Sequence, residues 1–185
     1  MRRYIITGAP GAGKTTILTA LRDRGYPVVG EAATDVITRE QRKGREEAWR
    51  SPDFLDAITR LQRRRQQLPL PPAATVQVFD RSPICTLALA RYADVPVTPL
   101  LAGEVDRVVG ERIYQPRVFF VRLLGFITRT AARRITLEQS ERFEKIHEQA
   151  YREWGFELID VPPAPLADRV SMIDHHIAMA ADHVR

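Results

Sequence analysis

One stretch of the sequence combines residue types and spacing that suit phosphate binding. Residues 8–16 read GAPGAGKTT, which matches the phosphate-binding loop pattern with glycine at both required ends. Glycines let backbone amides close around phosphate oxygens, and the N-terminus of the following helix adds its positive end. Lys14 is expected to reach the β- and γ-phosphates of a nucleoside triphosphate, and the Thr15 hydroxyl to coordinate Mg²⁺. The predicted nucleotide-binding residues are Gly8, Ala9, Pro10, Gly11, Ala12, Gly13, Lys14, Thr15 and Thr16.

Acidic residues at the ends of two other strand-like segments supply a second part of the candidate chemistry. Glu31 ends the second such segment, and Asp80-Arg81 ends the third. In an open parallel sheet, ligands bind beyond the carboxyl ends of the strands, so these side chains should face the same crevice as the loop. We expect Asp80 to hold Mg²⁺ with Thr15, Glu31 to accept a proton from an attacking hydroxyl, and Arg81 to hold substrate or neutralise charge. A helix cap for Glu31, a surface ion pair for Arg81 and the base role for Asp80 remain alternatives.

An arginine cluster follows the fourth strand-like segment. Arg129, Arg133 and Arg134 lie in a stretch that precedes a helix, where they are expected to form a lid around residues 128–138. Such a lid could close over the phosphates and stabilise the charge that develops during transfer. A solvated helix face is the alternative, because arginine is abundant in this chain.

These residues need a scaffold, and the hydrophobic pattern alternates between strand-like and helix-like segments. That alternation predicts an α/β fold with a parallel sheet. Ser51-Pro52 is expected to open one of the helices, since serine is a good N-cap and proline suits the first turn. The expected strands are residues 4–7, 27–30, 75–80, 117–123 and 156–161, and the expected helices are 14–24, 32–43, 52–66, 83–92, 103–114, a long one after Thr136 and 165–184.

Composition narrows the class of protein. A chain of 185 residues without repeats or linkers fits one domain over residues 1–185. The single cysteine excludes an internal disulfide framework and favours the reducing cytoplasm, and no segment approaches the roughly 20 apolar residues of a membrane span. The net charge of +5 suits anionic ligands, but the aromatic residues do not follow a basic track, which argues against nucleic acid. The four histidines lack metal-site spacing and are expected at the surface or the core edge.

Together these motifs resemble a small P-loop ATPase/kinase family that is grouped with AAA-domain proteins and related to ribosylnicotinamide kinases and to nucleoside or nucleotide kinases. The resemblance rests on GAPGAGKTT, the strand ending at Glu31, WRSPDFLDAITRLQ, VQVFDRSPICTLALARY and the arginine cluster, and it covers residues 3 to about 170. It implies a nucleoside-kinase-like P-loop fold, a three-layer α/β/α sandwich with a five-stranded parallel sheet in the order 2-3-1-4-5 and a lid. It also favours Glu31 as the base, because deoxynucleoside kinases carry an acid at the end of strand two.

Three positions depart from the pattern of those families. Thr34 stands where ribosylnicotinamide kinases typically carry arginine, and Cys85 and Thr86 stand where the broader family often has an acid. These departures concern which acceptor is bound more than which reaction is catalysed.

The sequence therefore predicts a Mg²⁺-dependent phosphotransferase that moves the γ-phosphoryl group of ATP, with GTP as the alternative, to a hydroxyl of a nucleoside-like molecule or another small metabolite. Hydrolysis of ATP is compatible with the same site. Two other functions remain as alternatives: a regulatory ATPase or GTPase that acts through a protein partner, and a polynucleotide 5′-kinase.

Overall fold

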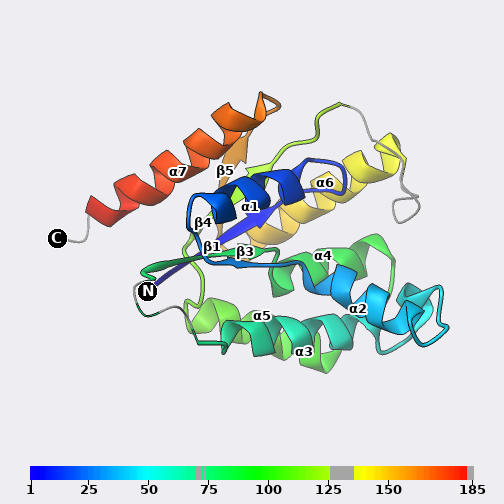
Figure 1. Cartoon of the computed structure of the whole chain (residues 1–185). Coiled ribbons are helices and arrows are strands. Elements are labelled where there is room, and N and C mark those ends of the chain that lie inside the picture. Colours follow the sequence, from blue (N-terminus) through cyan, green and yellow to red (C-terminus); the bar gives the residue numbers. More distant parts are fainter. Residues whose placement is uncertain (70–71, 73, 126–135, 183–185) are drawn as a thin grey trace.

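A five-stranded sheet carries the candidate site in the computed structural model, which describes residues 1–69, 72, 74–125 and 136–182 (Figure 1). All four strand pairings are parallel, and the order is β2-β3-β1-β4-β5, as the resemblance implied. The strands are β1 (Arg2–Thr7), β2 (Val28–Val29), β3 (Val76–Asp80), β4 (Arg117–Val121) and β5 (Glu157–Val161).

Helices cover both faces of the sheet and make three layers, as expected (Figure 1). Successive residues of β1 point to opposite sides: Ile5 packs with residues of α2 to α6, whereas Tyr4 and Ile6 pack with α1 and α7. Among the described residues, no helix is long and apolar enough to cross a membrane. The helices are α1 (Lys14–Asp23), α2 (Ala32–Gln41), the short 3-10 helix η1 (Ala48–Arg50), α3 (Phe54–Gln66), α4 (Pro83–Tyr92), α5 (Pro99–Gly110), α6 (Leu137–Glu153) and α7 (Leu166–Asp182).

Strand register brings three chain segments to one edge of the sheet. Ile6 of β1 pairs with Asp80 of β3, and the backbone N–H of Arg81 donates to the Ile6 carbonyl at 3.0 Å. On the other side of β3, Val29 pairs with Phe79, so β2 also ends at this edge. The segments that follow β1, β2 and β3 therefore leave the sheet side by side.

The expected helix over residues 103–114 is wrong in its bounds, because α5 begins and ends four residues earlier. Thr98 caps its N-terminus by accepting a hydrogen bond from the Leu101 backbone N–H at 3.1 Å, and Pro99 occupies the first turn. Beyond the C-terminus, Arg112 adopts a left-handed φ of 50°, which a continuing helix does not allow.

The start of α3 also differs from expectation. Ser51 does not cap it: the Ser51 carbonyl accepts a hydrogen bond from the Phe54 backbone N–H at 3.0 Å, and the cap position falls to Asp53. The reason lies in η1, which already turns the chain over Ala48–Arg50 and places Ser51 in the connecting turn.

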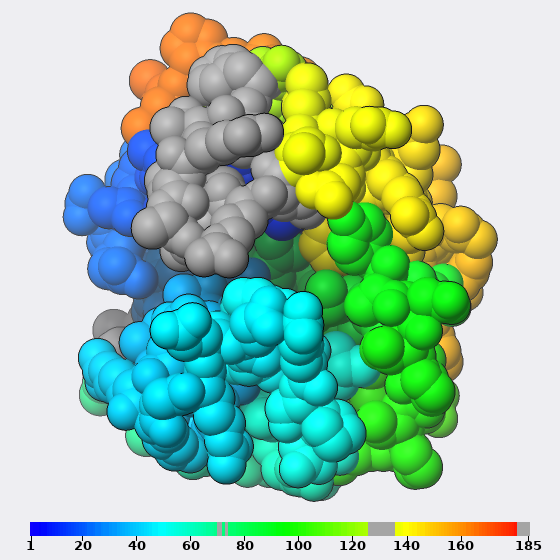
Figure 2. All heavy atoms as spheres, turned by 90° about the vertical axis from the view of Figure 1, so that its right-hand side faces the viewer, coloured from blue at the N-terminus to red at the C-terminus, as the bar shows by residue number. Residues whose placement is uncertain are grey.

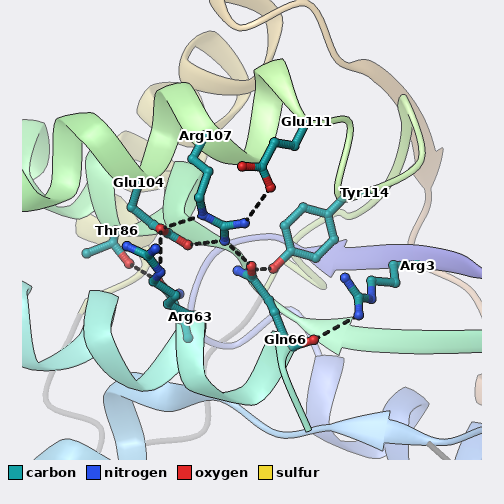
Figure 3. Close-up of polar contacts among 9 residues, drawn as sticks. Arg3, Arg63, Gln66, Thr86, Glu104, Arg107, Glu111 and Tyr114 are labelled. Atoms are coloured by element: carbon teal, nitrogen blue, oxygen red, sulfur yellow. Dashed lines mark hydrogen bonds and ion pairs between the residues drawn. The ribbon is translucent and has the colours of Figure 1, made fainter. Parts of the chain in front are cut away.

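A buried polar network fixes α3 to its neighbours (Figure 3). The Glu104 side chain on α5 is 1% exposed and accepts two hydrogen bonds from Arg107, at 2.9 and 2.6 Å. Arg63 of α3 lies 3.8 Å from the same carboxylate, and Arg107 also donates to the side chain of Gln66. The Gln66 carbonyl in turn accepts a hydrogen bond from Arg3 of β1 at 2.8 Å. One network thus joins α3, α5 and the central strand.

This network predicts a large stability difference between two glutamates that both bind Arg107. We expect Glu104→Ala to lower the free energy of unfolding by about 3 kcal/mol, because it leaves two arginines beside an empty buried position. Glu111→Ala removes an ion pair whose carboxylate is 57% exposed and should cost less than about 1 kcal/mol. Urea unfolding at neutral pH measures both, and equal losses would contradict the assignment of Glu104 as the centre of the network.

Candidate active site

The glycine-rich loop connects β1 to α1 and needs glycine at two positions for different reasons. At Gly8, φ is 136°, and a Cβ would lie 2.2 Å from the Val121 carbonyl oxygen of β4. Gly13 caps α1 with a left-handed φ of 85°. Lys14 follows it, is 7% exposed, and donates from Nζ to the Ala9 carbonyl at 2.9 Å. The loop therefore curls around its own lysine.

A cavity of about 870 Å³ opens beside this loop. In Figure 2 the surface is hollowed between the cyan segment that contains η1 and the green and yellow helices. Three residues of the loop do not line the cavity: Gly8, Ala9 and Ala12. Ala9 and Ala12 are fully buried. The predicted nucleotide-binding residues that line the cavity are Pro10, Gly11, Gly13, Lys14, Thr15 and Thr16.

Glu31 and Arg81 meet at the wall of this cavity. Arg81 Nε lies 2.6 Å from Glu31 Oε1, and the Thr34 hydroxyl donates to Glu31 Oε2 at 2.8 Å. Glu31 occupies the cap position of α2, yet its side chain makes no capping hydrogen bond. Its carboxylate is turned toward Arg81, and Arg81 pairs with a cavity acid instead of a surface acid. Thr34, which departs from the family pattern, contacts the predicted base.

The backbone of Arg81 is in an uncommon conformation. Its φ of 71° lies in the left-handed region, which costs energy for a residue with a Cβ. Two contacts hold the side chain: the ion pair with Glu31 and an Nη1 to His147 Nε2 distance of 3.2 Å. His147 lies on α6 and is fully buried. In this conformation Arg81 lines the cavity.

Asp80 has the character of a metal ligand. Its Oδ1 is buried and has no hydrogen-bond partner among the described residues. Carboxylate and hydroxyl oxygens are the ligands that Mg²⁺ prefers, and Mg²⁺ at phosphate sites takes one or two protein oxygens and completes its shell with phosphates and water. Asp80 and Thr15 both line the cavity, so they fit this requirement.

The electrostatics of the site follow from burial and from neighbouring charges. Burial, with the negative charge of Glu31, raises the pKa of Asp80 to about 6. Burial, with the positive charge of Arg81, lowers the pKa of Lys14 to about 8. For Glu31, burial acts to raise the pKa, but the charges of Arg81 and Lys14 and the Thr34 hydrogen bond outweigh it, so the pKa lies below its usual value. Glu31 is therefore ionised at neutral pH.

Burial, and then the charge of Arg81, lower the pKa of His147 far below its usual value, so the imidazole facing Arg81 is neutral.

Away from the loop, the cavity wall is largely apolar and aromatic. The Phe143 ring packs against Tyr92, with centroids 4.8 Å apart, and against His147, with centroids 4.3 Å apart. Gln62 is the polar group of this wall on α3: its Oε1 accepts a hydrogen bond from Thr86 at 3.0 Å, and its amide nitrogen has no partner among the described residues. The larger apolar and aromatic lining residues are Ile37, Trp49, Phe54, Ile58, Leu89, Tyr92, Leu124 and Phe143.

The predicted lid arginines Arg129, Arg133 and Arg134 lie outside the described residues. Asp35, one turn beyond Glu31, pairs with Arg65 at the surface and does not line the cavity.

The sequence interpretation missed two residues of the site. His147 was expected at the surface or the core edge, which is wrong because it is fully buried. A signal existed, since His147 follows Phe143 by one turn on the apolar face of the long helix. Gln62 carried a weaker signal, because it is a polar residue between apolar neighbours at helical spacing.

Comparisons with known proteins agree with this fold. Residues 3–169 match the family model described as an AAA domain, and no curated protein matches the chain. Three solved structures of deoxyadenosine kinase from M. mycoides are similar: with the products dCMP and a flexible dCDP (TM-score 0.57, 16% identity), with dATP (0.53, 16%) and with dCTP (0.56, 17%). The matches cover 96%, 95% and 97% of this chain and 99%, 99% and 100% of those chains. At these identities the likeness establishes a shared fold.

The raised pKa of Asp80 predicts a pH-dependent stability difference. Because the folded-state pKa is about 6 against a usual 3.8, folding favours the protonated carboxyl, and this stabilisation is lost as pH rises from about 4 through about 6. The unfolding free energy of Asp80→Asn should therefore rise relative to wild type across that interval. Urea unfolding at pH 4, 5, 6 and 7 measures the difference. Asp106→Asn, at an exposed position of α5, is the control and should show no such trend. A flat difference for Asp80→Asn would contradict the assignment.

Proposed function

The chain belongs to the AAA-domain family whose model its residues 3–169 match, and from this premise we propose that it is a Mg²⁺-dependent kinase of nucleoside-like small molecules. The reaction is transfer of the γ-phosphoryl group of ATP to a hydroxyl of the acceptor. Residues 1–185 would act as one catalytic domain, with the lid around 128–138 as its predicted closing part.

One observation carries the proposal: the Glu31–Arg81 ion pair lines the same cavity as the phosphate-type loop and an aromatic wall. A protein that only hydrolyses nucleoside triphosphate needs a site for water and no second pocket. Here one cavity is lined by Lys14, by Glu31 and by an apolar wall, and its volume of about 870 Å³ is in the range of small-molecule sites. This shape supports an acceptor pocket.

Phosphate binding falls to the loop in this proposal. Its backbone amides and Lys14 would hold the β- and γ-phosphates, and burial would strengthen each of these charge interactions. When bound, Mg²⁺ would neutralise phosphate charge, held by Asp80 and the Thr15 hydroxyl. The hydrogen bond from Lys14 to the Ala9 carbonyl keeps the ammonium poised near the phosphate position.

On the acceptor side, Glu31 would take the proton of the attacking hydroxyl. The oxygen of that hydroxyl would form a bond to the γ-phosphorus. The bond from that phosphorus to the β-γ bridging oxygen breaks, and ADP leaves with the electron pair. Arg81, adjacent to Glu31, would stabilise the transferring group. Glu31 then releases the proton to solvent. The pKa of Glu31 lies below its usual value, so the side chain is ionised at neutral pH, which is the form that can accept the proton.

The wall chemistry supports a flat, nucleoside-like acceptor. Phe143, Tyr92 and Trp49 offer aromatic faces, and planar rings stack favourably on such faces. The Gln62 amide nitrogen could donate a hydrogen bond to an acceptor atom on such a ring. The M. mycoides enzymes of the same fold are deoxyadenosine kinases, which agrees with an acceptor of this class.

The test is turnover of ATP and of GTP with Mg²⁺, with and without a pool of nucleosides, sugars and small alcohols, and with mass spectrometry of the products. Wild type should form a phosphorylated product from the pool. Lys14→Met should abolish turnover. Glu31→Gln should bind ATP normally but lower kcat at least about 100-fold, because the proton acceptor is gone.

Asp35→Asn is the matched control for Glu31→Gln. It changes an exposed carboxylate one helical turn away and should keep kcat within about twofold of wild type. Normal transfer by Glu31→Gln would overturn the base assignment. Slow hydrolysis that no acceptor affects would overturn the kinase proposal and favour the regulatory NTPase.

Gln62 generates a separate expectation about acceptor recognition. Gln62→Leu keeps the volume of the wall but removes its amide, so the acceptor KM should rise about tenfold while the ATP KM stays unchanged. Gln67→Leu, at the exposed end of α3, is the control and should change neither constant. Steady-state kinetics with the acceptor found in the pool measures both values. An unchanged acceptor KM for Gln62→Leu would exclude the amide from recognition.

A further inference from the structure

Arg169 is a buried cation at a position that helix electrostatics does not favour. It lies in the first turn of α7, where the helix dipole repels positive charge, and it is 4% exposed. The hydrogen bonds and ion pairs of the described residues give it no carboxylate partner, and burial lowers its pKa. An unpaired buried charge is expensive, so the local fold alone does not account for it.

The contacts of Arg169 lead to the phosphate-type loop. Its Nη2 donates to the Ala12 carbonyl at 3.0 Å and to the Arg122 carbonyl, just beyond β4, at 3.3 Å. Its Nη1 lies 3.1 Å from the point where a Cβ on Gly13 would be. One guanidinium therefore joins α7, the end of β4 and the loop.

The hydrogen bond to Ala12 fixes the orientation of one peptide plane. A trans peptide places its C=O and the following N–H on opposite sides. Because the Ala12 carbonyl points toward Arg169, the Gly13 N–H points away from it, and Gly13 lines the cavity. The Gly13 N–H has no hydrogen-bond acceptor among the described residues. It is thus directed toward the cavity side of the loop.

We propose that Arg169 is a positioning residue for the phosphate site: it aims the Gly13 N–H at the polyphosphate of the bound nucleotide and places an uncompensated positive charge directly behind the loop. This inference rests on the proposed function, because it requires a nucleoside triphosphate at the loop. It also gives Gly13 a second reason to be glycine, since a side chain there would crowd the guanidinium.

The test is the Kd for ATP with Mg²⁺, measured by titration calorimetry at low and at high salt, beside the KM values for ATP and for the acceptor. Arg169→Met keeps the length of the side chain but removes its charge and donors, so the ATP Kd should rise at least about tenfold. The increase should shrink at high salt because a charge has been removed. The acceptor KM should stay within about twofold, since the acceptor wall is not touched.

Arg24→Met is the matched control for the docking of α7. It removes the partly exposed ion pair between Arg24 and Asp174, which joins α1 to α7 without contacting the loop. This variant should bind ATP as wild type does. If it weakens ATP binding as much as Arg169→Met, the effect is general loosening of α7 and the inference is overturned.

Arg169→Lys keeps the inference falsifiable if Arg169→Met does not fold. The ammonium retains the charge but cannot reproduce the planar fork, so the ATP Kd should rise about threefold or more in a folded protein. Binding at the wild-type level by either folded variant overturns the inference. If the wild-type chain binds neither ATP nor GTP, the proposed function and the inference are both overturned. If the wild-type chain binds ATP and Arg169→Met binds it equally well, only the inference is overturned.

Discussion

The parallel pairing of β3 between β1 and β2 is the constraint on which the candidate site depends. It requires all three strands to end at the same edge, so the loop after β1, Glu31 after β2 and Asp80-Arg81 after β3 must leave the sheet together. A slip of one residue in β3 would move each of Asp80 and Arg81 to the other face of the sheet, because side chains alternate along a strand. The buried apolar residues Val78 and Phe79 oppose such a slip, since each packs into a different core cluster. Packing of the two residues that precede Asp80 thus fixes the position of the polar side chains at the sheet edge.

That edge gathers charges that folding alone would avoid. Lys14 and Arg81 are buried beside Glu31 and Asp80, and only part of this charge is paired within the protein. The raised pKa of Asp80 and the lowered pKa of Lys14 are two signs of the same cost, because each group loses hydration that its neighbours do not fully replace. A site that is destabilised when empty is suited to a highly charged ligand, which can supply the missing partners.

Local sequence signals were sufficient for the parts of the site that depend on backbone geometry. The glycine spacing around Lys14 predicted the loop, and an acid at the end of a strand predicted which side chains face the cavity, because both follow from strand direction. Contacts between residues far apart in the chain gave weaker signals in the sequence. Nothing in the neighbours of Arg169 along the chain indicates that it reaches Ala12, 157 positions away. The bounds of α5 were missed although Thr98 and Pro99 form a local helix start, with Thr98 as the cap and Pro99 in the first turn.

Two anchored bodies flank the point where transfer would occur. On one side, the Glu104 network fixes α3, which lines the cavity, and on the other, Arg169 joins the loop to α7 and to the Arg122 carbonyl just beyond β4. Between them lies the Glu31–Arg81 pair, held by an arginine in a strained backbone conformation. In the proposed reaction, an arriving hydroxyl would compete with Arg81 and Thr34 for the oxygens of Glu31. In the proposed reaction, acceptor binding would reorganise the Glu31–Arg81 pair while the anchored helices on either side stay in place.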